Sequence, residues 1–171
     1  SAGTKALVQH FDEIANIVST QYLFAPSPLA VDIGSNDGSL LKCFKKHGFR
    51  GLGVDPARDI AAEATAAGIP TLPEFLTRDS VEKILEEYGA ASLVCAFNVF
   101  AHTDDLEDMT KCIRDLLAPD GIFVFECSYL GDILERKLLG TIFHEHLSHH
   151  SATPLAAFLK RLGMEDRKST R

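Results

Sequence analysis

The sequence predicts an α/β fold in which a doubly wound, mostly parallel sheet carries helices on both faces. Short apolar runs alternate with segments of helical periodicity about ten residues long, the pattern of repeated strand–helix–strand units. Right-handed crossovers between such strands place helices on both sides of the sheet. One run, residues 92–97, is apolar throughout, as expected of a strand covered on both faces. Glycines also follow helical segments where helices end, as at Gly48 and Gly68.

The chain begins with an amphipathic helix over residues 5–21. Its apolar side chains recur at helical spacing on one face. Pro26 and Pro28 end that region, and residues 29–33 form the first strand. Residues 34–38, with the sequence Gly-Ser-Asn-Asp-Gly, form the turn that follows this strand.

Helices and strands then alternate through the first half of the chain. The helices have helical apolar spacing, and the strands between them are short and bounded by glycine, proline or aspartate. Helices are expected at residues 39–47, 57–67 and 79–88, and strands at residues 51–55 and 69–72.

The alternation continues in the second half with a fourth and a fifth strand. Residues 92–97 are the fourth strand, and Asp104 with Glu107 resembles a capping box that opens a helix over residues 105–117. The fifth strand is expected at residues 122–126, after a turn at residues 119–121.

The last helix has a start signal and a stop signal. Thr153 is expected to cap it, with Pro154 at its first position and Gly163 after its end. A sixth strand is expected to begin near Met164, but the sequence stops at Arg171. We therefore expect the sheet to be incomplete at its C-terminal edge.

Length and charge bound the class of protein. The chain has 171 residues, which fits one domain that includes residues 1–171. With 17 basic and 24 acidic residues its net charge is −7, which gives no electrostatic reason to bind nucleic acid or an anionic membrane. No apolar run is long enough for a transmembrane helix, and the N-terminus lacks the apolar stretch of a signal peptide.

The four cysteines do not form a metal or redox motif. No pair has the Cys-x-x-Cys spacing, and each cysteine lies in an apolar or helical context. We expect buried free thiols and a reducing, cytoplasmic setting for Cys43, Cys95, Cys112 and Cys127.

The turn after the first strand and the acid that ends the second strand indicate a ligand site. In a doubly wound sheet, ligands bind beyond the carboxyl ends of the strands, where the strand order reverses. Gly34 and Gly38 allow a sharp turn beside a ligand, and Asp55 is placed to accept hydrogen bonds from ribose hydroxyls. A structural reading, of tight-turn glycines with an N-capping aspartate, stands beside this one.

The kind of ligand follows from departures from the dinucleotide motif. That motif requires Gly-x-Gly-x-x-Gly, whereas Asn36 and Ser39 occupy the second and third glycine positions here. Asp37 adds negative charge where a pyrophosphate would approach the helix N-terminus. The turn therefore favours a cationic, phosphate-free nucleoside such as S-adenosylmethionine over NAD.

The sequence resembles the class I S-adenosylmethionine-dependent methyltransferases, which have a Rossmann-like fold. The resemblance covers residues 29–126 and rests on the runs VDIGSNDGSLL, GLGVDPA, NVFAHTDDL and LLAPDGIFVFE in that order. The residues that it implies for cofactor binding are Asp32, Gly34, Ser35, Asn36, Gly38, Asp55, Pro56, Glu74, Phe75, Asn98, Val99 and His102.

The resemblance also implies which part of the cofactor each group contacts. The residues of the first strand and its turn would surround the amino acid part, and Asp55 would hold the ribose. Phe75, in the run Pro73-Glu74-Phe75, would lie near the adenine and stack on it. The residues after the fourth strand, Asn98, Val99 and His102, would line the methionine side and the approach to the methyl group.

Four of the seven histidines fall within residues 144–150. One reading is a metal site, which the sequence does not favour because no cysteine and no other histidine-rich run lies nearby. A second reading is a polar loop with hydrogen-bonded histidines. A third is acid–base chemistry, since a histidine titrates near neutral pH and an adjacent carboxylate orients it.

A narrower resemblance supports the third reading. The pair GSNDGSLL and FHEHLSHHS resembles the sugar C-methyltransferases that act on nucleotide-linked keto-deoxysugars. This implies that His146 is the base that removes a proton next to a ketone, that Glu145 assists it, and that His144 is supporting or structural. Residues 1–25 would then be an N-terminal helix, residues 29–126 the cofactor-binding core, and residues 127–163 the substrate and catalytic segment with the last helix.

The sequence departs from that family in two respects. The family has a tyrosine where this chain has Phe143, so the phenolic donor of the family is missing at this position. The family also has a cysteine-rich zinc domain before the methyltransferase domain and a further domain after it, and neither lies within these residues. Much of a sugar-nucleotide site would come from those flanking parts.

The sequence is also compatible with two other functions and leaves the roles of two further residues undecided. The alternatives are an S-adenosylmethionine-dependent O- or N-methyltransferase of another small molecule, and a cofactor-binding domain without catalysis. Glu126 ends the fifth strand, and its side chain either reaches the ligand site or lies outside it. Tyr129 either packs or faces the substrate in place of the missing phenol.

Overall fold

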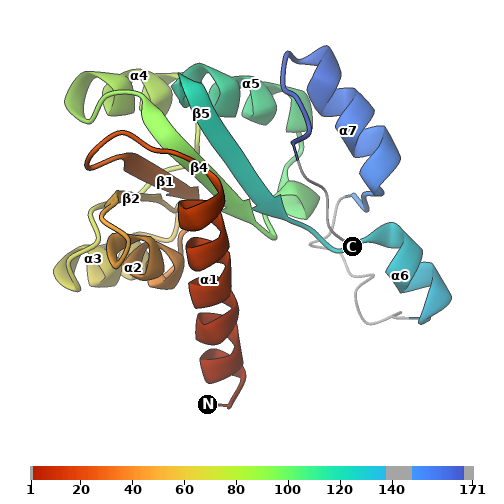
Figure 1. Cartoon of the computed structure of the whole chain (residues 1–171), viewed down its shortest axis with the longest axis horizontal. Coiled ribbons are helices and arrows are strands. Elements are labelled where there is room, and N and C mark those ends of the chain that lie inside the picture. The colour runs from red at the N-terminus through yellow and green to blue at the C-terminus, as the bar shows by residue number, and fades with distance from the viewer. Residues whose placement is uncertain (1, 138–147, 168–171) are drawn as a thin grey trace.

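Five parallel strands form one sheet in the computed structural model, which describes residues 2–137 and 148–167 (Figure 1). Their order in the sheet is β3-β2-β1-β4-β5, so the order reverses between the neighbours β1 and β4. The predicted α/β class with a doubly wound parallel sheet is confirmed. The strands are β1 (Leu29–Ile33), β2 (Arg50–Val54), β3 (Thr71–Leu72), β4 (Ala91–Phe97) and β5 (Leu117–Glu126).

Helices cover both faces of this sheet. Figure 1 shows α1, α2 and α3 on one side and α4 and α5 on the other, with α6 and α7 beside the β5 edge. The helices are α1 (Ala2–Gln21), α2 (Ser39–Lys45), α3 (Arg58–Ala66), α4 (Arg78–Glu87), α5 (Leu106–Leu116), α6 (Leu130–Glu135) and α7 (Ala152–Arg161), and a 3-10 turn, η1, spans Phe100–His102. None of the described helices is long and apolar enough to cross a membrane.

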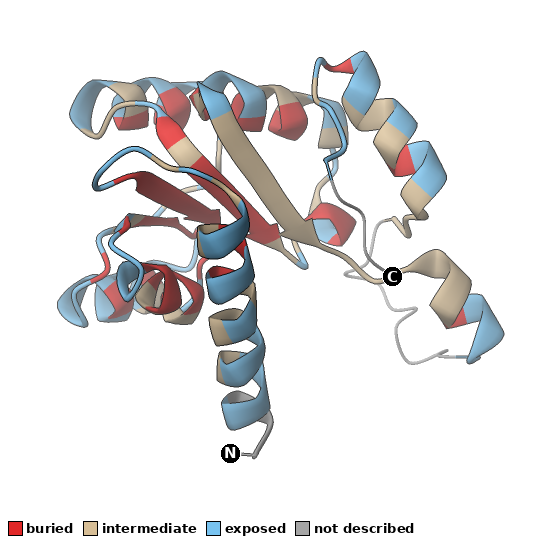
Figure 2. Ribbon diagram, in the orientation of Figure 1, coloured by how far each residue is buried: buried red, intermediate tan, exposed pale blue. Residues whose placement is uncertain are grey.

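The core consists of one apolar cluster on each face of the sheet. Alternate side chains of a strand point to opposite faces, so Ala30 packs toward α1 and α2 whereas Val31 packs toward α4 and α5. Figure 2 shows β1 and most of β4 buried. Burying apolar surface on both faces contributes roughly 25 cal/mol per Å², which explains why these central strands are apolar along almost their whole length.

The cysteines are free thiols, as expected, but one of them is only half-buried. Cys43, Cys95 and Cys112 are buried, whereas Cys127 follows the edge strand β5 and keeps part of its surface exposed. Burial, reinforced by the hydrogen bond with Asp12, raises the pKa of Cys43 to about 11. Burial also raises the pKa of the other three thiols, and a thiol with a raised pKa is a poor nucleophile.

The two predicted helix caps are wrong in position. Asp105, not Asp104, caps α5, because its side chain accepts a hydrogen bond from the Asp108 backbone N–H at 2.9 Å. Adjacent acids at 104–105 and 107–108 fit the cap pattern in two registers, and sequence alone does not choose between them. At α7 the residue before the helix is Ser151, so Thr153 lies inside the first turn.

The strand predictions differ from the structure mainly at β5. This strand begins at Leu117, and residues 118–121 loop out of register between the pairs Ala91–Leu117 and Leu93–Ile122. The predicted turn at 119–121 is thus an irregularity within the strand. Met164–Arg167 form no strand in the described part of the chain, so the sixth strand expected near Met164 does not begin there.

Candidate functional site

The turn after β1 is held in a left-handed backbone conformation at three positions. Gly34 has φ +69°, Asn36 φ +49° and Gly38 φ +73°. The N–H of Gly34 donates to the Val54 carbonyl at 2.8 Å, which attaches the turn to the end of β2. A Cβ atom at Gly34 would lie 2.9 Å from Cγ2 of Val99, so only glycine fits between this turn and the chain after β4.

Asp55 links the turn to the chain after β2. One carboxylate oxygen accepts the Asn36 N–H at 2.8 Å and the other accepts the Ala57 N–H at 2.9 Å. The side chain is nearly buried, with 8% of its surface exposed. A carboxylate has about four lone-pair positions, so each oxygen keeps one for a ligand. The predicted partnership between the turn and Asp55 is therefore present, and Pro56 follows on the surface between Asp55 and Ala57.

Two polar side chains are buried beneath the turn. Asp32 is only 3% exposed, and its burial, reinforced by the neighbouring Asp55 carboxylate, raises its pKa well above the ordinary value. Ser35 is buried too, and its hydroxyl has no hydrogen-bond partner among the residues that the structure describes. Asp32 and Ser35 are thus buried on the inner side, while Gly34 and Asn36 form the exposed surface of the turn.

Asp37 occupies the place that a phosphate takes in dinucleotide-binding folds. Its carboxylate accepts the N–H of Ser39 at 3.0 Å and the Ser39 hydroxyl at 2.9 Å, at the start of α2. A negative charge already satisfies this helix N-terminus. The Asp37 carboxylate thus lies at the start of α2, where the sequence places the negative charge that favours a cationic ligand over a pyrophosphate.

The chain after β3 presents an exposed aromatic ring. Phe75 is 71% exposed, and a large exposed apolar side chain beside polar groups is a common ligand contact. Glu74 is directed elsewhere, because its carboxylate pairs with Lys83 of α4 at 3.2 Å. Within the run Pro73-Glu74-Phe75 that is predicted near the adenine, the structure leaves the Phe75 ring exposed and pairs Glu74 with Lys83.

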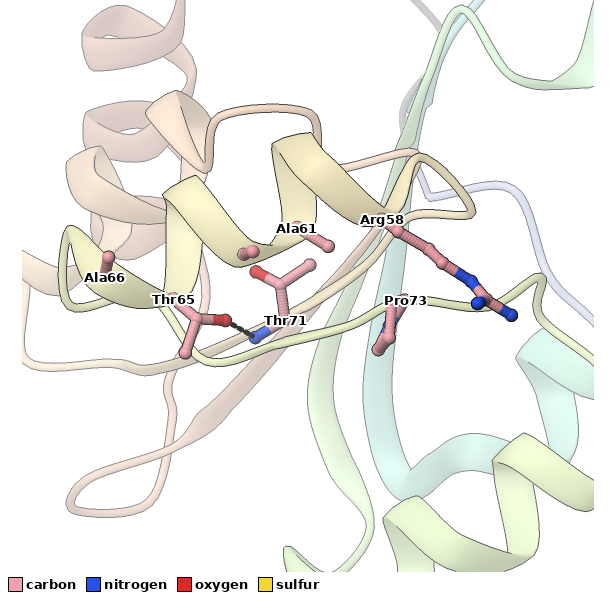
Figure 3. A pocket seen from close by; sticks show the side chains of 7 residues that line it. Arg58, Ala61, Thr65, Ala66, Thr71 and Pro73 are labelled. Carbon is pink, nitrogen blue, oxygen red and sulfur yellow. Dashed lines mark hydrogen bonds between the residues drawn. The ribbon is translucent and has the colours of Figure 1, made fainter.

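A groove of about 560 Å³ lies between α3 and β3, outside this site (Figure 3). The N–H of Thr71 donates to the Thr65 hydroxyl at 3.1 Å across its floor. Figure 3 shows Arg58 and Pro73 at one end of it. Its walls are Arg58, Ala61, Ala62, Thr65, Ala66, Thr71 and Pro73, and of these Pro73 belongs to the run predicted near the adenine.

The connection after β4 approaches the turn through Val99. Asn98 has φ +57° and is exposed, and its N–H donates to the Glu126 carbonyl at 2.7 Å. The N–H of His102 donates to the Val99 carbonyl at 2.9 Å, which forms η1 and leaves the His102 side chain exposed. The structure thus brings Val99 to Gly34 and places Asn98 and His102 on the same short connection.

The described end of the histidine run, residues 148–150, is attached to η1. The Ser148 hydroxyl donates to the Phe100 carbonyl at 3.3 Å and lies 3.0 Å from Nε2 of His150. The His150 carbonyl accepts the Leu130 N–H at 2.8 Å, and His150 pairs with Tyr129 in a parallel bridge. The predicted catalytic residues His144, Glu145 and His146, together with Phe143, lie outside the described residues.

Sequence reasoning missed one pair at the end of β5. Glu126 Oε2 lies 2.6 Å from Nε2 of His10, which belongs to α1. The sequence predicts Glu126 as a strand-end acid, whereas His10 lies 116 residues away on an exposed helix face that carries no sequence signal. Tyr129 packs its ring against Gly131, where a Cβ atom would lie 2.5 Å from the Tyr129 ring.

We call the ends of β1, β2 and β3 with residues 34–38 and 55–57 the turn side. The ends of β4 and β5 with residues 98–102, 126 and 148–150 form the β4–β5 side.

Across residues 2–137 and 148–167, no three His, Cys, Asp or Glu side chains are placed to hold a metal ion together.

The fold and this site define a methyltransferase domain. The chain belongs to the methyltransferase-domain family, whose model matches residues 10–169. S-adenosylmethionine is the methyl donor of this domain. The C-methyltransferase NovU of Streptomyces niveus is 35% identical over 159 residues, which are 93% of this chain and 38% of that protein. The chain thus spans well under half the length of this relative.

Solved structures share the fold at low sequence identity. A putative methyltransferase of Haloferax volcanii, in complex with the activator Trm112, has a TM-score of 0.71 at 16% identity, over 96% of this chain and 74% of that chain. The plantazolicin methyltransferase BpumL, bound to a pentazolic analog and S-adenosylhomocysteine, has a TM-score of 0.66 at 10% identity, over 91% of this chain and 62% of that chain.

The residues present fit S-adenosylmethionine. The buried Asp55 carboxylate keeps acceptor positions suited to ribose hydroxyls, and Phe75 offers an exposed ring suited to adenine stacking. Asp37 adds negative charge at the turn, which suits a sulfonium cation and repels phosphate. When bound, the cofactor supplies an electrophilic methyl group.

Proposed function

We propose that this domain methylates carbon, at the position next to a ketone of a nucleotide-linked deoxysugar. The observation that carries the proposal is the 35% identity over 159 residues to a C-methyltransferase. The run Phe143–Ser151, which resembles that of the sugar C-methyltransferases, supports the same chemistry. Because the chain spans 38% of that relative's length, other segments would contribute to the sugar-nucleotide site.

The proposed reaction needs a base and an electrophile. His146 removes the proton from the carbon next to the ketone, and Glu145 orients and polarises the His146 ring, while His144 is supporting. The carbon–hydrogen electron pair becomes an enolate. Bound S-adenosylmethionine would supply the methyl group to this carbon and would leave as S-adenosylhomocysteine, which keeps the electron pair of the sulfur–methyl bond.

The described structure supports a position for the reaction at the β4–β5 side. Ser148 follows His146 by two residues in the sequence and is bonded to the Phe100 carbonyl of η1. The same connection carries Asn98 and His102, which are proposed to line the methionine side of the cofactor. The end of the proposed catalytic segment and the proposed approach to the methyl group therefore meet on one short stretch of backbone.

The cofactor roles on the turn side are part of the same proposal. Asp55, with Pro56 beside it, holds the ribose, and Phe75 stacks on the adenine. The turn surrounds the amino acid part of the cofactor with Gly34, Asn36 and Gly38, with Asp32 and Ser35 buried on its inner side. The free thiols of the described cysteines support a reducing, cytoplasmic setting for this reaction.

The test combines proton exchange with methyl transfer. In D₂O with S-adenosylhomocysteine bound, the wild-type chain should exchange the hydrogen next to the ketone of a nucleotide-linked keto-deoxysugar. His146→Ala should lose both this exchange and single-turnover methyl transfer, by about 100-fold or more, as expected for a general base. The control, His47→Ala, changes an exposed histidine at the amino ends of the strands and should leave both unchanged.

The product distinguishes this proposal from its alternatives. With a ¹³C-labelled methyl group, carbon methylation gives a carbon-bound methyl resonance, whereas a resonance of an O- or N-methyl group would overturn the C-methylation proposal. Full exchange and transfer by His146→Ala would remove His146 from the role of base. Tight binding of S-adenosylhomocysteine without any exchange or transfer would favour a cofactor-binding domain that has lost catalysis.

A further inference from the structure

The pair formed by His10 and Glu126 lies where the β4–β5 side opens to solvent. Glu126 is the last residue of β5 and pairs in the sheet register with Phe97, the last residue of β4. Its backbone carbonyl accepts the Asn98 N–H at 2.7 Å, and its carboxylate lies 2.6 Å from the His10 ring. One residue therefore contacts both the proposed methionine-side residue Asn98 and helix α1.

Helix α1 forms a wall beside this part of the site. The ring of Phe11 packs edge-on against Phe97 with centroids 5.8 Å apart, so consecutive residues of α1 contact the ends of β4 and β5. Figure 1 shows the N-terminal half of α1 extending past the carboxyl ends of these strands. Leu7, one helical turn before His10, is 49% exposed on this projecting half.

A second ion pair on α1 attaches the helix to a neighbouring element and serves as a comparison. Asp12 pairs with Lys46 at 2.7 Å and attaches α1 to the end of α2, away from the strand ends. Both pairs are exposed, and exposed ion pairs contribute little to stability. Since Asp12 and the apolar face of α1 already hold the helix, stability alone gives little reason for a carboxylate–imidazole pair at the edge of the site.

The chemistry of the pair suits hydroxyl groups. The two side chains are 44% and 43% exposed, which leaves the second carboxylate oxygen and Nδ1 of the ring accessible to a ligand. A carboxylate accepts hydrogen bonds, and an imidazole nitrogen donates or accepts, so together they match neighbouring hydroxyls. The carboxylate disfavours a phosphate at the same place.

We infer that His10 and Glu126 bind the hydroxyl-bearing sugar ring of the methyl acceptor, on the α1 side of the site. The inference rests on the proposed function and extends it by naming acceptor contacts outside the histidine run. The pair positions the acceptor and does not take its proton. It is therefore expected to change acceptor affinity and to leave cofactor affinity unaltered.

The test measures acceptor binding and cofactor binding separately in the whole chain. A nucleoside-diphosphate-linked keto-deoxyhexose is titrated into the wild-type chain saturated with S-adenosylhomocysteine, and again into Glu126→Gln and His10→Ala. Each variant should weaken acceptor binding about tenfold, while the Kd of S-adenosylhomocysteine and the Tm stay within the range of the control. The control is Asp12→Asn, which removes an exposed ion pair of the same helix.

His10→Gln sharpens the result, because its amide can still donate to Glu126 and should recover most of the acceptor affinity that His10→Ala loses. Equal acceptor binding by wild type, Glu126→Gln and Asp12→Asn would overturn the inference and leave the proposed function intact. If the wild-type chain does not bind this probe at all, the inference that its own His10 and Glu126 hold the acceptor fails, whereas the methylated product tests the proposed function separately.

Discussion

The turn side and the β4–β5 side of the site are held by contacts of different sequence range. On the turn side, the Asp55 carboxylate accepts hydrogen bonds from backbone N–H groups that lie 2 and 19 residues away in the sequence. On the β4–β5 side, Ser148 reaches Phe100 across 48 residues and His10 reaches Glu126 across 116. The turn side is thus built from neighbouring strand–helix units, whereas the β4–β5 side is assembled from segments spread over almost the whole chain.

This difference matches the division of labour that we propose. Cofactor binding needs a fixed backbone turn and one well-placed acid, and short-range contacts supply both. Acceptor binding needs groups from several directions around the methyl group. The two sides meet at the contact between Gly34 and Val99, so a change at that contact is expected to have the largest effect.

Gly34→Ala should be the most damaging of these changes. A side chain at φ +69° costs about 1–2 kcal/mol, and overlap with the stiff Val99 side chain adds about 1–3 kcal/mol. Gly48→Ala, at φ +85° in open space, should cost only the backbone part. Chemical denaturation measures the free energy of unfolding of both variants. Adding Val99→Ala to Gly34→Ala should recover the part of the loss that comes from overlap with the Val99 side chain. Equal losses for Gly34→Ala and Gly48→Ala would show that the two sides do not meet tightly there.

Asp55→Ala should weaken S-adenosylhomocysteine binding about 100-fold. Hydrogen bonds to a charged group contribute roughly 1.5–3 kcal/mol, and the change also releases the Asn36 N–H of the turn. Asp59→Ala, an exposed acid in the first turn of α3, is the control and should bind normally. Calorimetric titration gives both Kd values. A Kd for Asp55→Ala that matches the control would remove this residue from the cofactor site.

His150→Ala should lower the rate of methyl transfer without changing the affinity for the cofactor. The change removes the contact with the Ser148 hydroxyl and the ring contact with Phe100, so the rate of methyl transfer should fall about tenfold. The Kd of S-adenosylhomocysteine should stay within about twofold, because the proposed ribose and adenine contacts of the turn side are untouched and the backbone hydrogen bond of η1 remains. Thr153→Ala, exposed on α7, is the matched control. A parallel loss of rate and cofactor affinity would contradict the independence of the two sides.

Asp32→Asn should have the smallest effect, and it should depend on pH. Burial raises the pKa of Asp32 above the ordinary 3.8, so the folded chain holds this proton more tightly than the unfolded chain does. Stability is therefore lost as pH rises through 3.8 toward the folded pKa, whereas asparagine has no such loss. The variant should gain a few degrees in Tm near pH 7 and none near pH 3. A Tm difference between the variant and the wild type that is the same at both pH values would contradict the raised pKa of Asp32.

The sequence predicted the turn side in detail and the β4–β5 side only in part. β1 has the predicted bounds, and Gly34, Gly38 and Asp55 lie together as expected. The cap of α5 is off by one residue because adjacent acids fit two registers. The loop within β5 and the attachment of Ser148 to η1 carry no local pattern. His10 looks in the sequence like any residue on a solvated helix face.

The sequence by itself determined the α/β class, the order of strands and helices, the left-handed glycine turn and the acid opposite it. These features depend on apolar spacing and on backbone conformations that single residues dictate. Only the tertiary structure decided that α1 reaches the end of β5, that Val99 fills the space above Gly34, and that Ser148 is attached to η1. Such contacts join polar or small residues far apart in the chain, and packing alone selects their partners.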